Sequence, residues 1–113
     1  MSKFTKQERA VAVARMLERT AKVMGVKPRQ IMASEVGTPE VNKARKAFIW
    51  LVKPILMNHE TAAILGRRTY GSIDTALRKC RTLMRRDEDF KVKLNLLMDE
   101  CAFEREKYSY KDA

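Results

Sequence analysis

Hydrophobic residues recur along most of the chain at the three- and four-residue intervals typical of amphipathic α-helices. The pattern predicts six helices, at about 6–24, a short one opening at 28, then 39–53, 59–65, 70–85 and 87–107. Four glycines and three prolines are few for an all-β chain, which needs frequent turn signals. We therefore expect an all-α, compact bundle of about six helices in a single domain spanning 1–113, with a core over about 5–107 and a frayed tail at 108–113.

Short sequence signals mark where several of these helices begin and end. Thr5-Lys6-Gln7-Glu8 is a capping box, and Gly25 is a suitable stop for the helix that follows it. Thr38-Pro39-Glu40 reads as an N-cap, a proline at the first helical position and an acid near the positive helix end. Because Pro54 has no backbone N–H, the third helix is expected to end or kink near Lys53.

The later boundaries follow from similar signals. Asn58 is the expected cap of the fourth helix, Gly66 ends that helix, and Thr69 is expected to cap the fifth. Asp87-Glu88-Asp89 places three acids at the start of the sixth helix, where the helix dipole favours them.

Each predicted helix carries an apolar stripe that is expected to face the core. Trp50 lies off the main stripe of its helix, so it either fills the core or lies at an interface. The sixth helix is more apolar than a peripheral helix requires, so it either packs on the first helix or contacts a protein partner or a second copy. The expected buried set is Val13, Leu17, Ala21, Met24, Ile31, Met32, Ala44, Ala47, Phe48, Leu51, Val52, Ile55, Ala62, Ile64, Leu65, Ile73, Ala76, Leu77, Cys80, Met84, Phe90, Leu94, Leu97 and Cys101, widened by Leu96, Met98 and Phe103.

The charge is strongly positive and unevenly distributed. The chain has 24 Lys plus Arg against 14 Asp plus Glu, a formal net charge of +10. Residues 1–86 hold 19 basic and 6 acidic side chains, whereas residues 87–113 hold 5 basic and 8 acidic ones. The densest basic block, 67–86, contains seven basic residues and only one acid, Asp74. A basic cluster of this kind is either a solvated face or the footprint of a nucleic acid.

The basic block flanks a pattern that resembles a helix-turn-helix. A short helix, a turn containing Gly66 and a second helix capped by Thr69 make the candidate. In such a motif the second helix presents small or hydrogen-bonding side chains to base edges, and basic residues nearby contact phosphates. We expect base contacts from Tyr70, Gly71, Ser72, Thr75 and Arg78. We expect phosphate contacts from Lys43, Arg45, Lys46, Arg67, Arg68, Thr69 and Lys79.

The same residues also have plainer interpretations. As an alternative to reading bases, Ser72 supports the helix cap from the first turn of the helix. Thr75 is then a surface threonine, and Tyr70 packs on the turn. Two helices joined by a glycine turn are common, so the pattern alone leaves both interpretations open.

The stretch Leu65-Gly66-Arg67-Arg68-Thr69-Tyr70-Gly71-Ser72-Ile73, followed by Ala76 and Arg78-Lys79, resembles the signature of domain IV, the C-terminal DNA-binding domain of the bacterial replication initiator DnaA. The resemblance extends upstream through 26–32 and 43–51, and it covers about 11–83 in all. It implies a fold of the Trp repressor-like superfamily.

The resemblance implies major-groove reading by Thr69, Tyr70, Gly71, Ser72 and Ala76. Only Ser72 and Ala76 preserve the chemistry of that family, and the helical pattern also turns Ala76 toward the core. The loop at 33–38 has no basic residue where the family has one, so minor-groove reading by that loop is not expected. The family's ATPase machinery has no counterpart, because the chain contains no G-x-x-x-x-G-K-[ST] motif.

No arrangement of residues supports an enzyme, a metal site or a cofactor. The single histidine, His59, is expected to be a surface or capping residue, and Cys80 an inert core residue. No apolar run is long enough for a membrane span, and residues 1–9 lack the apolar stretch typical of a signal peptide. We expect a cytoplasmic, nucleoid-associated protein that binds double-stranded DNA sequence-specifically, as a transcription regulator or a regulator of replication. The competing hypothesis is a non-catalytic adaptor that binds proteins through its acidic C-terminal helix.

Overall fold

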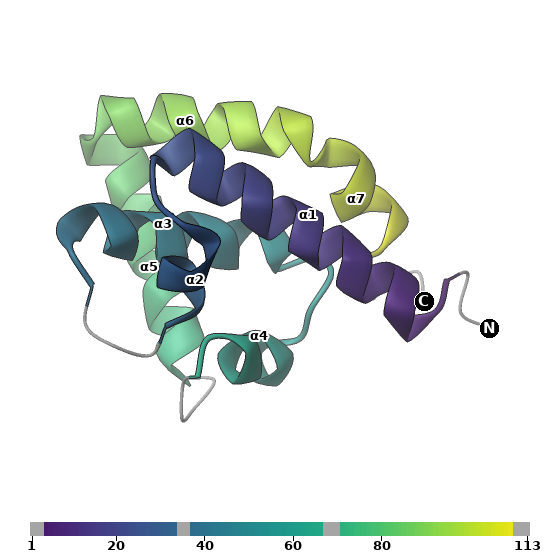
Figure 1. Cartoon of the computed structure of the whole chain (residues 1–113). Coiled ribbons are helices and arrows are strands. Elements are labelled where there is room, and N and C mark those ends of the chain that lie inside the picture. Colours follow the sequence, from purple (N-terminus) through teal and green to yellow (C-terminus); the bar gives the residue numbers. More distant parts are fainter. Residues whose placement is uncertain (1–3, 34–36, 67–70, 110–113) are drawn as a thin grey trace.

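A computed structural model describes residues 4–33, 37–66 and 71–109, and within these ranges it contains seven α-helices and no strand. Figure 1 shows the long first helix and the last two helices along one edge, with a short fourth helix at the opposite edge. The helices are α1 (Lys6–Met24), α2 (Pro28–Met32), α3 (Pro39–Val52), α4 (Asn58–Ile64), α5 (Gly71–Arg86), α6 (Glu88–Glu100) and α7 (Ala102–Lys107). The expected all-α bundle is confirmed.

The local signals at the first helices act as predicted. The Thr5 hydroxyl accepts from the Glu8 backbone at 3.1 Å, and the Glu8 carboxylate accepts from the Thr5 backbone at 3.2 Å. Gly25 has the left-handed backbone that ends α1, with φ of 73°. The Thr38 hydroxyl accepts from the backbone of Val41 at 3.2 Å and so caps α3.

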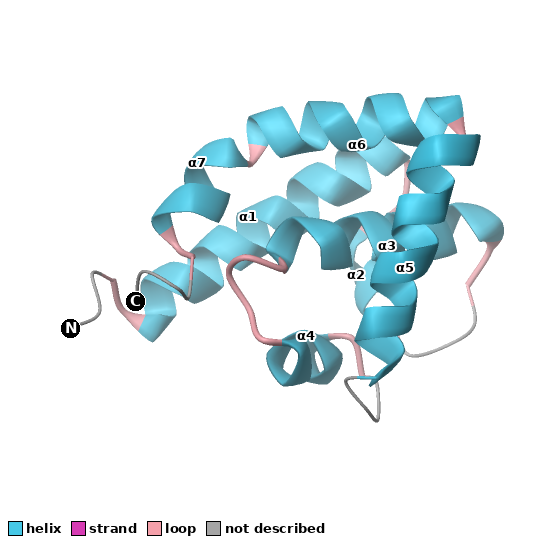
Figure 2. Ribbon diagram, turned by 180° about the vertical axis from the view of Figure 1, so that it is seen from behind, coloured by secondary structure: helices cyan, strands magenta, loops and turns pink. Residues whose placement is uncertain are grey.

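Helix α3 is the centre of the bundle, and its apolar residues contact most other helices. It packs against α1, α2, α5 and α6. In Figure 2, which views the molecule from behind, α5 crosses α3. Phe48 and Leu51 are fully buried between these neighbours, and Ile55 remains buried in the turn after the helix ends. The helix stops at Val52 next to Pro54, as predicted. The position of α5, which carries the candidate site, is therefore set by the central helix.

The cap of α4 differs from the prediction. Its N-cap is Met57 rather than Asn58, because the Glu60 carboxylate reaches back and accepts from the Met57 backbone at 2.9 Å. The Asn58 amide instead donates to Asp74 of α5 at 2.9 Å. Asn58 therefore links α4 to α5 and does not cap its own helix.

The predicted sixth helix is divided into α6 and α7 at Cys101. Arg19 of α1 lies at this point, donates to the Glu100 carbonyl at 3.0 Å and pairs with the buried Glu104 carboxylate. A side chain that bonds a backbone carbonyl competes with the helical hydrogen-bond ladder and bends the helix. The same contacts show that this region packs on α1.

Most of the expected core is buried, but several predicted core residues are not. Leu96 is 48% exposed and Phe103 is 66% exposed, so they do not widen the α6 stripe inward, and Met32 is 42% exposed. Met24, Ile64, Met84 and Met98 are half-buried. Tyr108, where fraying was expected to begin, packs its ring edge-on against Phe4.

Candidate nucleic-acid interface

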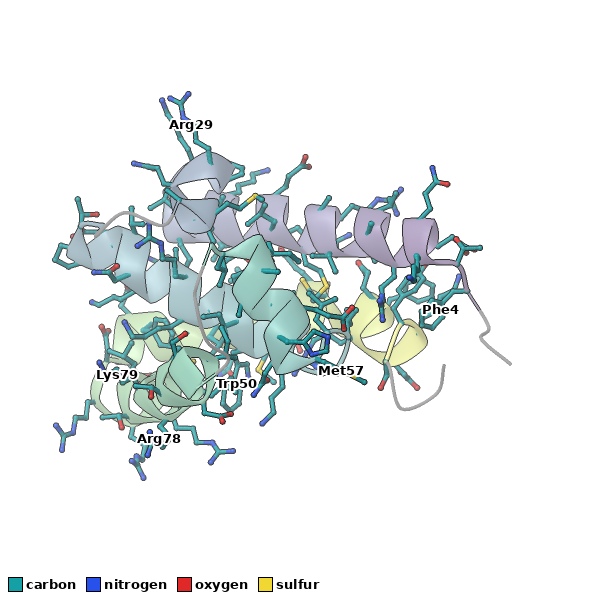
Figure 3. The ribbon with its side chains drawn as sticks, turned by 90° about the horizontal axis from the view of Figure 1, so that it is seen from below. Phe4, Arg29, Trp50, Met57, Arg78 and Lys79 are labelled. Carbon is teal, nitrogen blue, oxygen red and sulfur yellow. The ribbon has the colours of Figure 1, made fainter. Side chains whose placement is uncertain are left out.

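The face of α5 that points away from the core carries hydroxyl and basic side chains. Helix α5 buries Ile73, Ala76, Leu77 and Cys80, whose spacing of three and four residues places them on one face, whereas the opposite face points to solvent. Thr75 is half-buried and Arg78 is exposed, and the Arg78 guanidinium donates to the Thr75 hydroxyl at 3.3 Å. Figure 3 shows Arg78 and Lys79 extending outward from α5. Two predicted base-reading residues therefore lie together on an accessible helix face.

A shallow recess of about 250 Å³ lies between α3 and α5 beside this face. Lys46 of α3 and Lys79 of α5 both line it, so ammonium groups from two helices border one depression. Hydroxyl and ammonium donors are the groups that bind phosphate oxygens. The structure thus brings together four predicted site residues, and the full lining is Asn42, Lys46, Ser72, Thr75, Ala76 and Lys79.

Ala76 lies on the core side of the recess. It is only 8% exposed, in agreement with the helical pattern that turned it inward. It nevertheless forms part of the recess lining, because the side chains of Ser72 and Lys79 stand on either side of it along α5.

Lys43 forms an ion pair with Asp87 of the same chain. Its ammonium donates to the Asp87 carboxylate at 2.7 Å, at the junction of α5 and α6. The carboxylate raises the pKa of Lys43, and the ammonium in turn lowers the pKa of Asp87. The other Asp87 oxygen accepts from the Phe90 backbone at 3.1 Å and caps α6. Any phosphate that binds Lys43 must therefore compete with Asp87.

Arg45 is directed into the fold rather than toward solvent. It is 6% exposed, and its guanidinium donates to the backbone carbonyls of Ile31 at 3.2 Å and Gln30 at 2.9 Å. These carbonyls belong to the last turn of α2, where helical carbonyls lack partners. Arg45 therefore fastens α2 to α3, and its buried guanidinium does not face solvent as the expected phosphate contact requires.

Four of the predicted site residues, Arg67, Arg68, Thr69 and Tyr70, lie outside the described residues. Gly71 is the first residue of α5. Helix α4 ends at Ile64, and Gly66, two residues later, has a positive φ of 65°, a conformation that favours glycine.

Asn42 is the residue of the recess that sequence reasoning missed. It lies one helical turn before Lys46 on α3, and that spacing is the signal that places both on one face. Its amide donates to the Gly37 carbonyl at 3.2 Å and its carbonyl oxygen accepts from Arg45 at 3.3 Å. Asn42 therefore orders the wall of the recess through contacts within the protein.

Trp50 lies on the other flank of α5. It is half-buried against the core, and the Arg81 guanidinium lies 5.9 Å from the centre of its ring. Trp50 therefore fills the core in part, and a cation of the same chain lies over its ring.

The positive charge of α5 is not neutralised within the described part of the chain. No ion pair among the described residues includes a basic side chain of this helix, and its one acid, Asp74, accepts from Asn58. The exposed basic residues are Arg78, Lys79, Arg81, Arg85 and Arg86. An uncompensated row of cations on one helix attracts a polyanion.

The described ranges contain no comparable group of residues for metal binding, thiol chemistry or membrane insertion. No cluster of three or more His, Cys, Asp or Glu residues there has the geometry of a metal site. Cys80 and Cys101 are free and buried, and burial raises the pKa of the Cys80 thiol to about 12. Among the described helices, none combines the length and apolar character that a bilayer crossing requires.

Comparisons with models of known protein families, with curated proteins and with solved structures returned no match for this chain.

Proposed function

We propose that this protein binds double-stranded DNA sequence-specifically, with α4 and α5 acting as a helix-turn-helix and α5 entering the major groove. The function that fits best is regulation of transcription, with regulation of replication as its nearest variant, carried out at the nucleoid. The proposal extends the resemblance of 65–79 to the DNA-binding domain of DnaA.

The observation that carries the proposal is the recess between α3 and α5. There Lys46 and Lys79 border the hydroxyls of Ser72 and Thr75, beside the exposed Arg78. Phosphate contacts from two elements would set the register of the helix, and hydroxyl and guanidinium groups would then reach base edges.

The proposed phosphate contacts are Lys46, Arg67, Arg68 and Lys79, with Thr69 as an uncharged contact, while Lys43 stays paired with Asp87. Four neutralised phosphates correspond to a log–log salt slope of about −3.6 at roughly 0.9 per phosphate. A protein with such a slope binds duplex DNA much more weakly at about 200 mM salt than at about 50 mM.

The base-reading assignment is tested by selecting bound sites from a random duplex pool for the wild type and for Ser72→Ala and Thr75→Ala. Each variant is expected to relax the preference at one or two positions, worth about 1–3 kcal/mol per position, and to leave the salt slope unchanged. Thr82→Ala, in the later turns of α5, is the matched control and is expected to retain the wild-type site. Selected sites identical for all four proteins would contradict the assignment.

The alternative function is a protein-interaction adaptor, and the exposed Val92, Leu96 and Phe103 on α6 and α7 are the observation that favours it. The two functions differ in a gel-shift assay with random duplexes at low and high salt. An adaptor without a nucleic-acid role gives no salt-dependent shift, whereas the proposed function requires one.

A further inference from the structure

A second, chemically different cavity lies away from the recess, where α1, α2, α3 and α4 meet. Its volume is about 310 Å³, and its walls are almost wholly apolar. Its apolar walls come from Val13 and Leu17 of α1, Phe48 of α3, Leu56 and Ile64 of α4. Figure 1 shows α4 standing beneath α1 and α3 at this place. Water is a poor occupant of such a space, because it finds few hydrogen-bonding partners there.

Lys6 and Arg9 are the charged residues among those that line the cavity, and no acidic residue is among them. Arg9 donates through one nitrogen to the Glu60 carboxylate at 2.9 Å, which leaves its other guanidinium donors available. Lys6 takes part in no ion pair with another described residue. Both charged residues of the lining are therefore basic, and Glu60 pairs with one of them.

The opening owes its width to two alanines of α1. Ala10 and Ala14 line the cavity and are exposed, so at these two positions α1 presents only a methyl group to the opening. The Arg9–Glu60 ion pair spans from α1 to α4 beside this opening. A ligand can therefore enter between the two helices without displacing a large side chain.

We propose that this cavity binds a small amphipathic carboxylate, with the hydrocarbon chain between α1 and α4 and the carboxylate at Lys6 and Arg9. The volume is at the lower end of the range of small-molecule sites, and the combination of apolar walls with a few convergent polar groups is their usual character. The ligand would contact α4, which is joined to α5 through the Asn58–Asp74 hydrogen bond. The proposal concerns a site outside the DNA-binding face and does not depend on DNA binding.

The test is calorimetric titration of the full chain with decanoate below its micelle-forming concentration. Ala14→Leu fills the opening at an exposed helix position that tolerates leucine, and it is expected to weaken decanoate binding roughly tenfold or more. Ala102→Leu, at an exposed alanine of α7 outside the cavity, is the matched control and is expected to bind as the wild type does. Amide hydrogen exchange in α4 is expected to slow when decanoate is added to the wild type.

The carboxylate is tested with decanol and decyltrimethylammonium, which have the same chain length. Decanoate is expected to bind more tightly than either, and Lys6→Gln is expected to weaken decanoate alone by roughly twofold to fivefold, as for a partly exposed charge pair. Lys22→Gln, elsewhere on α1, controls for the change in net charge. The proposal is overturned if wild-type protein does not bind decanoate, if Ala14→Leu binds it unchanged, or if decyltrimethylammonium binds as tightly as decanoate.

Discussion

At the scale of single residues, the structure separates three basic side chains of α3 that look alike in the sequence. Lys46 borders the recess, Lys43 is paired with Asp87, and Arg45 is buried against the carbonyls of α2. Arg45 has the spacing of the buried residues Val41 and Phe48, four before and three after it, and that spacing is the sequence signal for its inward direction. Charge alone therefore does not identify a phosphate contact.

Replacing Asp87 by Asn is expected to raise DNA affinity and to steepen the salt slope by about 0.9, because Lys43 is released to a phosphate. Asparagine is also a good N-cap, so the cap of α6 is retained. Asp89→Asn changes the net charge equally, but it frees only Lys93 of the same helix. Equal effects of the two substitutions on the salt slope, measured by fluorescence anisotropy, would contradict the competition at Lys43.

The Lys43–Asp87 pair also predicts a pH dependence of stability. Because Lys43 and the cap hydrogen bond lower the pKa of Asp87 below its ordinary value of 3.8, the ionised carboxylate stabilises the folded state. This contribution is complete at pH values above 3.8 and is lost as the pH falls through the lower folded-state pKa. Urea unfolding is expected to show wild type more stable than Asp87→Asn at neutral pH, and the difference is expected to shrink below pH 3.8.

Replacing Arg45 by Lys is expected to destabilise the fold by about 1–3 kcal/mol, because an ammonium cannot reproduce the fork that bonds two backbone carbonyls. The salt slope of the folded variant is expected to equal that of the wild type. Urea unfolding and DNA titration are the two measurements. A variant of unchanged stability whose salt slope is shallower would show that Arg45 contacts phosphate after all.

At the scale of elements, the starts of α1 and α3 were predictable from neighbouring residues, whereas the division between α6 and α7 was not. Thr5 with Glu8 and Thr38 with Pro39 lie within one turn of the ends they determine, so the sequence pattern contains the whole cause. The division at Cys101 depends on Arg19, which is 82 residues away in the chain. No local pattern contains that contact.

The junction of α6 and α7 is expected to depend on the Arg19–Glu104 pair. Glu104→Gln removes the charge from a buried carboxylate that accepts from Arg19, and it is expected to cost about 1–3 kcal/mol of unfolding free energy. Glu106→Gln, on the exposed side of α7, is expected to change stability by less than about 0.5 kcal/mol. If thermal unfolding gives the same loss of stability for both variants, the Arg19–Glu104 pair does not hold α7 on α1.

At the scale of the whole molecule, the net charge of +10 combines a basic body with an acidic end. Helix α5 exposes five basic side chains, and Figure 1 places the start of this helix at the edge opposite α6. The all-α class and the α5 stripe were predictable because hydrophobic periodicity is a property of the sequence. The recess was not, because it requires Lys46 to stand across from Lys79 in space.

The most direct test of the DNA-binding proposal is the salt dependence of duplex affinity for the double variant Lys46→Ala/Lys79→Ala. Its matched control is Lys22→Ala/Arg29→Ala, which removes the same charge; Figure 3 shows Arg29 extending from the side of the molecule opposite Arg78 and Lys79. The recess variant is expected to flatten the log–log slope by about 2, and the control to keep the wild-type slope. Identical slopes for the two double variants would contradict the claim that DNA binds at the α3–α5 recess.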